Sequence, residues 1–274
     1  MEKILEQKIR QISEEVPQVE NEYMGEDGLL HCAVCHRNTQ TRVEVLGIPK
    51  VVRCVCDCDV KKRDEAKERG RQEELERQRR ICFAETNMAN WTFANDDRRN
   101  PKLSDAMKRY ADDFANFKKD SKGLLLYGTV GTGKTYYSAC IANELISKDY
   151  RVLMTSFTRL INQLQGMYEG KQRFIDNLNT YSLLIIDDLG VERNTEYMQE
   201  MVFHIIDSRY RSGLPFIVTT NLTSDELTKT QDIGSKRIYD RILERCIPVE
   251  VAGVSRRRTT LKETNAEMKA RLGL

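Results

Sequence analysis

The sequence predicts an α/β protein in which helices cover both faces of a parallel sheet, preceded by a small cysteine-rich region. Short runs of apolar residues recur through the second half of the chain, and segments with helical spacing separate them. The apolar runs cover residues 123–128, 151–156, 182–188, 215–221 and 247–251. Helices are expected at 134–146, 158–168, 195–211 and 235–245. Continuous apolar strands that alternate with helices are typical of a parallel sheet buried on both faces.

The composition is that of a folded globular protein. The 274 residues are 40% hydrophobic and 31% charged, and the net charge is only +2. Contact with nucleic acid would therefore have to come from local patches rather than from overall charge. No apolar run reaches the ~18 residues of a membrane span, and the N-terminus lacks a signal-peptide pattern. We therefore expect a cytoplasmic protein with no membrane contact, whose cysteines stay reduced.

The chain is expected to have three parts. Residues 1–60 combine an amphipathic helix at 1–20 with a cysteine-rich segment that contains two short strands. The helix either packs on its own small domain or docks on another protein. Residues 61–80 carry mostly charged side chains and predict a solvated helical linker, with a helix that contacts nucleic acid as the alternative. Residues 81–274 form the α/β domain.

A glycine-rich loop follows the first apolar run. It matches the pattern G-x-x-x-x-G-K-[ST] through Gly128, Thr129, Val130, Gly131, Thr132, Gly133, Lys134 and Thr135. The pattern lies between a predicted strand and a predicted helix, which is the context of an ATP-binding P-loop. Its backbone N–H groups would surround the phosphates, Lys134 would reach the β- and γ-phosphates, and the Thr135 hydroxyl would bind Mg²⁺.

Three further polar residues end apolar strands. Asp187 and Asp188 close the run 182–188, and Asn221 closes the run 215–221. Ligands bind at the carboxyl ends of strands in open α/β sheets, so these side chains should lie near the P-loop. We expect Asp187 to hold Mg²⁺ and Asp188 to orient the attacking water in ATP hydrolysis. Asn221 is a candidate sensor of the γ-phosphate, although alone it would be an ordinary turn residue.

Five cysteines cluster near the N-terminus. The pair Cys32 and Cys35 precedes Cys54, Cys56 and Cys58, a spacing typical of a structural Zn²⁺ site. Four thiolates are needed, so we expect the first pair and two of the later three to bind zinc. The flanking residues His31 and His36 are alternative ligands. The three other cysteines, Cys82, Cys140 and Cys246, are isolated and are expected to be buried.

The motifs GTVGTGKT, LLIIDDLG, IVTTN, RIYDRILERC and GVSRRR together resemble the AAA+ ATPases. They are most similar to the DnaC/DnaI-type replicative helicase loaders and to the related IstB transposition helper ATPases. The resemblance implies that Arg241 acts in trans on the ATP of a neighbouring subunit, with Arg237 as a lesser candidate. It also implies that Arg257 is a second sensor that contacts ATP in cis.

The expected function is therefore an ATPase that loads a hexameric replicative helicase onto single-stranded DNA. The resemblance implies that the cysteine-rich region contacts the helicase, and that ATP-bound subunits form a homo-oligomer. Two alternatives stay open. The protein could be an IstB-like transposition helper, or a nucleotide-gated DNA-binding adaptor with negligible hydrolysis.

Overall fold

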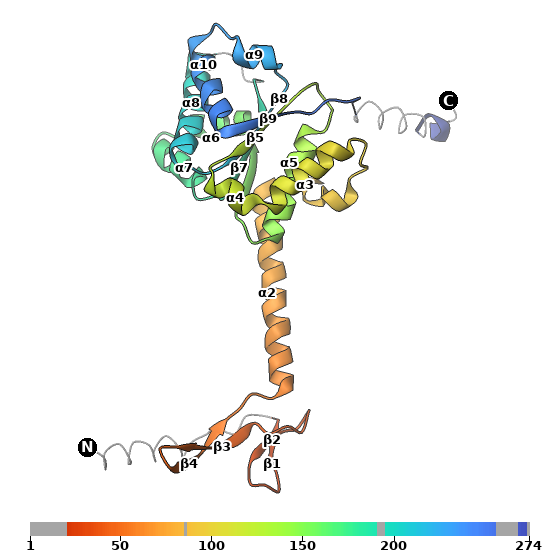
Figure 1. The fold of residues 1–274 in the computed structure, drawn as a ribbon, viewed down its shortest axis with the longest axis vertical. Helices are drawn as coiled ribbons and strands as arrows, with labels where there is room; N and C mark the ends of the chain where they lie inside the picture. The colour runs from red at the N-terminus through yellow and green to blue at the C-terminus, as the bar shows by residue number, and fades with distance from the viewer. Residues whose placement is uncertain (1–20, 85–86, 191–194, 256–267, 273–274) are drawn as a thin grey trace, which may run out of the picture. The chain divides into compact units, whose positions relative to one another are not determined.

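The structure is a computed structural model that describes residues 21–84, 87–190, 195–255 and 268–272. The helix predicted at 1–20 lies outside the described residues. The chain forms two compact units, Met1–Glu73 and Glu74–Leu274. Helix α2 (Asp57–Phe83) begins in the first unit and ends in the second. Figure 1 shows the elements of each unit.

The first unit contains two small antiparallel sheets. Strand β1 (Glu22–Met24) pairs with β2 (Leu30–Cys32), and β3 (Gln40–Val45) pairs with β4 (Ile48–Arg53). The two-residue turn between β3 and β4 places Leu46 and Gly47 at φ 54° and 78°, as the right-handed twist of a tight hairpin requires. Both strands of this hairpin lie in the cysteine-rich segment, for which two short strands were predicted.

Helix α2 extends the predicted linker in both directions. Every residue from 59 to 73 is exposed, in keeping with the charged sequence of this stretch. The last turns differ, because Leu75, Cys82 and Phe83 are buried in the core of the second unit. The helix therefore has a solvated middle and an end that packs like a core element.

The second unit is built on a five-stranded parallel sheet with the order β6-β7-β8-β5-β9. All five strands match the predicted apolar runs. They are β5 (Gly123–Tyr127), β6 (Val152–Ser156), β7 (Leu183–Leu189), β8 (Phe216–Thr220) and β9 (Cys246–Glu250). Every neighbouring pair of these strands is parallel. The predicted parallel sheet is thus confirmed.

Helices cover both faces of this sheet (Figure 1). The four expected helices are present as α5 (Lys134–Ser147), α6 (Phe157–Gln165), α8 (Glu196–Arg211) and α10 (Ile233–Arg245). Four further helices of the described residues were not predicted from the sequence, namely α3 (Pro101–Asp112), α4 (Phe114–Lys119), α7 (Lys171–Leu178) and α9 (Ser224–Thr228). Alternate strand residues enter two separate apolar clusters, with Leu124 and Leu126 in one and Leu125 in the other. Two cores, one on each face, account for the continuous apolar runs.

Candidate functional site

The glycine-rich loop joins β5 to α5, as predicted. Gly128, Gly131 and Gly133 have φ values of 137°, 85° and 110°, a region of conformational space that glycine enters without strain. A Cβ on Gly128 would lie 2.7 Å from the carbonyl oxygen of Val251, so this glycine is also needed for close packing. Helix α5 starts at Lys134, and the N-terminus of a helix that follows a glycine-rich loop favours the binding of an anion.

The ammonium group of Lys134 lies inside this loop. Its Nζ donates hydrogen bonds to the carbonyl oxygens of Gly128 and Thr129, at 2.8 and 2.9 Å, and to Oδ1 of Asn221 at 2.8 Å. The residue is only 6% exposed. The structure therefore brings together the predicted phosphate-binding lysine and the predicted γ-phosphate sensor, which are 87 positions apart in the chain.

The hydroxyl of Thr135 and the carboxylate of Asp187 are in direct contact. Thr135 Oγ1 donates to the two carboxylate oxygens at 3.2 and 3.0 Å, and Thr219 Oγ1 donates to Oδ1 at 2.5 Å. Burial raises the pKa of Asp187, and the hydrogen bonds from the two threonines offset part of the rise. Mg²⁺ prefers hard oxygen ligands. The hydroxyl of Thr135 and the carboxylate of Asp187 place such oxygens next to each other, so these two residues fit the ion.

Asp188 has a different environment from its neighbour. It is exposed and has a left-handed backbone, with φ 58°, and its N–H donates to Thr219 Oγ1 at 3.0 Å. The pairing of β7 with β8 shifts register between Ile186 and Leu189, and such irregularities re-aim side chains at sheet ends. Asp188 is among the residues that line a cavity over the loop, whereas the carboxylate of Asp187 accepts hydrogen bonds from the hydroxyls of Thr135 and Thr219.

A cavity of about 340 Å³ lies over the loop. Its wall is formed by Trp91, Val130, Gly131, Gly133, Lys134, Thr135, Tyr136, Asp188 and Asn221. The sequence analysis did not identify Trp91 or Tyr136. Their ring centroids lie 5.8 Å apart, and the Asn143 side chain donates to the Trp91 carbonyl at 2.9 Å. An aromatic wall beside a phosphate cradle is suited to a nucleotide base.

The two described arginines of the predicted site, Arg237 and Arg241, lie outside the cavity over the P-loop. Arg241 is on α10, and its Nε donates to Asp207 Oδ1 at 2.8 Å. Arg237, one turn earlier, has its guanidinium 4.3 Å from the centre of the Phe203 ring. Neither arginine lines the 340 Å³ cavity of its own chain. Arg257 lies outside the described residues.

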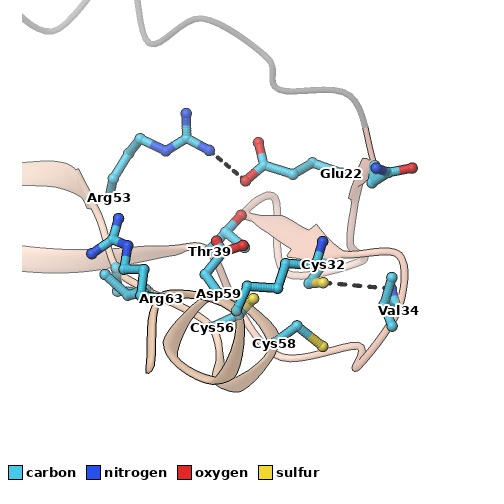
Figure 2. Close-up of a pocket in the computed structure, with 13 residues that line it drawn as sticks. Glu22, Cys32, Val34, Thr39, Arg53, Cys56, Cys58, Asp59 and Arg63 are labelled. Atoms are coloured by element: carbon cyan, nitrogen blue, oxygen red, sulfur yellow. Dashed lines mark hydrogen bonds and ion pairs between the residues drawn. The ribbon is translucent and has the colours of Figure 1, made fainter. Parts of the chain in front are cut away.

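Four of the five clustered cysteines meet in the first unit. Each sulfur of Cys32, Cys35, Cys56 and Cys58 lies within 4.8 Å of the other three. Cys32 ends β2, and Cys58 is in the first turn of α2. Figure 2 shows Cys32, Cys56 and Cys58 at the edge of a cavity of about 600 Å³. Four sulfurs around one Zn²⁺ at ~2.3 Å would be roughly 3.8 Å apart, so this set fits the ion.

The remaining predicted ligands have other partners. The thiol of Cys54 donates to the carbonyl oxygen of Asn38 at 3.1 Å. His31 lies 2.9 Å from Asp27 Oδ1, and His36 lies 3.1 Å from the Tyr23 hydroxyl. The choice that the sequence left open among Cys54, Cys56 and Cys58 therefore falls on the last two.

The crowded thiols differ in acidity. A backbone hydrogen bond at Arg37 lowers the pKa of Cys35 to about 7. The adjacent Cys35 sulfur, together with burial, raises the pKa of Cys58 to about 12. The four sulfurs cannot all become thiolates so close together unless a positive ion offsets their charge.

A family model described as "IstB-like ATP binding protein" matches residues 33–264. The chain belongs to this family. The match includes the P-loop and the strand-end carboxylates, and it establishes ATP binding as the family property. The predicted resemblance is thereby confirmed.

Curated relatives of this IstB-like chain include two helicase loaders. The replicative helicase loader DnaI of Bacillus subtilis (strain 168) is 28% identical over 167 residues, covering 56% of this chain and 54% of the relative. The loader DnaC of Escherichia coli (strain K12) is 26% identical, covering 46% and 52%. The chain thus spans about half the length of the curated relatives that it matches.

Solved structures agree on the fold. The crystal structure of DnaI is similar with a TM-score of 0.55 and 26% identity, over 66% of this chain and 99% of that one. The crystal structure of the DnaC helicase loader has a TM-score of 0.50 and 21% identity, over 60% and 97%, and shows the fold alone. Among the described residues of this IstB-like protein, no helix is long and apolar enough to cross a membrane.

Trp91 is the only tryptophan of the chain, so its fluorescence should report on the cavity. We expect a saturable change in emission when ATP or a non-hydrolysable analogue is added, because the base would contact the indole. Lys134→Ala should abolish this change at the same ligand concentrations, since phosphate binding loses its cation. Unchanged emission from the original protein, with nucleotide binding verified by calorimetry, would contradict the placement of the base.

The purified reduced protein should contain about one zinc per chain by elemental analysis. Cys56→Ser should lose the metal, because one of the four gathered sulfurs is removed. The matched control Cys54→Ser should keep it. Metal removal should abolish hydrogen-exchange protection in residues 21–60 while the second unit keeps its own. A chain that retains zinc in Cys56→Ser and loses it in Cys54→Ser would contradict the assignment.

Proposed function

We propose that the protein is an ATP-dependent loader that helps place a hexameric replicative helicase on single-stranded DNA. The observation that carries the proposal is the similarity to DnaI and DnaC, in a chain that combines a P-loop unit with a cysteine-rich unit. The cytoplasmic location and the contact of the cysteine-rich unit with the helicase are parts of the same proposal.

The first step is nucleotide binding in the 340 Å³ cavity. The phosphates would replace the carbonyl oxygens of Gly128 and Thr129 as partners of Lys134, and the γ-phosphate would compete for the Asn221 contact. Asn221 is thereby able to distinguish ATP from ADP. The loop glycines allow the backbone to approach the phosphates closely.

Hydrolysis is proposed to depend on the two carboxylates in separate roles. Thr135 and Asp187 would hold Mg²⁺, which neutralises charge on the phosphates when bound. Asp188 is exposed to the cavity and lies next to that pair, so it is the carboxylate able to orient a water molecule. Asp187, which is half-buried and already accepts two hydroxyl hydrogen bonds, is less suited to receive a proton from water.

We assign Arg241 to the site of a neighbouring subunit in an ATP-bound homo-oligomer. The residue does not line the cavity of its own chain, and a cation is needed for the charge on the transferring phosphoryl group. Arg257 keeps its proposed role as a contact to ATP in cis. ATP binding would then promote assembly, and hydrolysis would release the helicase.

Asp188→Asn should separate binding from release. The variant should bind ATP normally, because the P-loop and Asp187 are unchanged, while turnover falls ~10²-fold or more through loss of the orienting carboxylate. In a helicase-loading assay on single-stranded DNA, it should retain the helicase in a complex that persists in ATP. The measurements are turnover by phosphate release and co-elution with the replicative helicase of the same organism.

Two outcomes would count against this function. Normal turnover in Asp188→Asn would remove the residue from the hydrolytic step. Failure of the unmodified protein to bind the helicase or to stimulate its unwinding of DNA would leave an ATPase that is not a loader. Stimulation of a transposase instead would identify a transposition helper.

A further inference from the structure

Helices α8 and α10 carry an interleaved set of arginines and aromatic rings. The guanidinium groups of Arg237 and Arg241 lie 4.3 and 4.5 Å from the centre of the Phe203 ring. Those of Arg241 and Arg245 lie 5.9 and 4.6 Å from the Tyr210 ring. The arginines are four residues apart and the rings seven, so each set follows one face of its helix. Arg241 is the one guanidinium of the set that contacts both rings.

Asp207 holds Arg241 within this stack. Its Oδ1 accepts a hydrogen bond from Arg241 Nε at 2.8 Å, and its Oδ2 lies 2.9 Å from Arg211 Nε. The Asp207 side chain is only 13% exposed, against 27% for Arg241. Each carboxylate oxygen thus has its own guanidinium, and the partial burial of both partners limits screening by water.

The contact leaves part of the Arg241 guanidinium available. Nε bonds to Asp207 and Nη1 donates to the carbonyl oxygen of Arg237 at 3.1 Å. Nη2 has no hydrogen-bond partner within the described part of the chain. An arginine fixed through Nε and Nη1 has lost most of its rotational freedom but can still donate from the other end.

We propose that Asp207 is a positioning residue for hydrolysis in trans: it orients Arg241 so that Nη2 faces the phosphoryl group bound by the neighbouring subunit. This inference rests on the proposed role of Arg241 as a trans-acting group. Arg211 neutralises the second carboxylate oxygen, so Asp207 orients Arg241 without cancelling its full charge. The positioned arginine then adds positive charge where negative charge develops.

The test uses mixed subunits. Lys134→Ala supplies Arg241 but has no functional site, whereas Arg241→Ala has a site but supplies no arginine. Neither should hydrolyse ATP alone, and the mixture should recover activity. Adding Asp207→Asn to the Lys134→Ala subunit should lower the recovered kcat roughly 10- to 100-fold, the scale for a misplaced catalytic group. The KM for ATP should not change, because the intact site is in the other subunit.

Three controls make the result specific. Asp207→Asn in the Arg241→Ala subunit should have no effect, because that subunit has no arginine to position. Asp207→Glu in the Lys134→Ala subunit should restore part of the activity, because the carboxylate remains. Glu200→Gln removes one carboxylate from the same helix, two turns from Asp207, where its ion-pair partner is His204 at 3.6 Å, and should have no effect.

The outcomes distinguish this inference from the function on which it rests. Equal losses when Asp207→Asn is placed in either subunit would indicate a general structural role and overturn the inference, as would no loss in the Lys134→Ala subunit. A mixture of the two parent variants that co-assembles but stays inactive would instead refute Arg241 as a trans-acting group, and Asp207 with it.

Discussion

The candidate ATP site depends on the parallel register of three adjacent strands. Tyr127 at the end of β5 is paired with Thr220 at the end of β8, so the start of the P-loop and Asn221 follow at the same level of the sheet. Strand β7 lies on the other side of β8 and delivers Asp187 to that edge. A shift of one residue in any of these pairs would turn the strand-end side chains to the opposite face. The observed register therefore positions the three parts of the site at one edge of the sheet.

The same edge of the sheet brings opposite charges together. Lys134 is nearly buried, and its three oxygen partners satisfy its hydrogen-bonding capacity. Asp187 is satisfied in the same way by two threonine hydroxyls. Neither charge therefore has to be desolvated again when ATP enters, because phosphate oxygens and a metal ion can replace partners already in place. Such preorganisation lowers the reorganisation needed at the moment of reaction.

The sequence predicted the elements of the sheet for which burial allows only one kind of residue pattern. Five continuous apolar runs identified all five strands of the parallel sheet, because a strand buried on both faces has few alternatives to apolar residues. Helices α4, α7 and α9 were missed because they are short. Helix α3 was missed although Asn100 and Pro101 mark its N-terminus, because no glycine-rich motif or apolar strand adjoins it. Trp91 precedes the P-loop by 37 positions and lies outside any phosphate-binding motif. The only feature of the sequence that could have drawn attention to it is that the chain has no other tryptophan.

Contacts between residues that are far apart in the chain could not be predicted from the sequence. Nothing in the local pattern around Arg241 indicates Asp207, 34 positions earlier, although their ion pair determines how the arginine is oriented. The local sequence pattern also does not indicate that Cys56 and Cys58, rather than Cys54, join Cys32 and Cys35. This grouping follows from the chain turning into α2 at Asp57, which brings two sulfurs toward Cys32 and Cys35 while Cys54 is still bonded to the Asn38 carbonyl.

The two units reach stability by different physical means. Among the described residues 21–60, the buried apolar side chains are Leu29 and Leu30 together with the cysteines Cys32 and Cys56. So small a core cannot offset the conformational entropy lost when some forty residues become ordered. The second unit has two extensive apolar clusters, one on each face of its sheet, and needs no such support. A metal ion held by the four sulfurs would have a thermodynamic role, because its binding free energy would become folding free energy for a segment that lacks a sufficient core. Metal binding would then determine whether the cysteine-rich unit folds, whereas the fold of the P-loop unit would not depend on it.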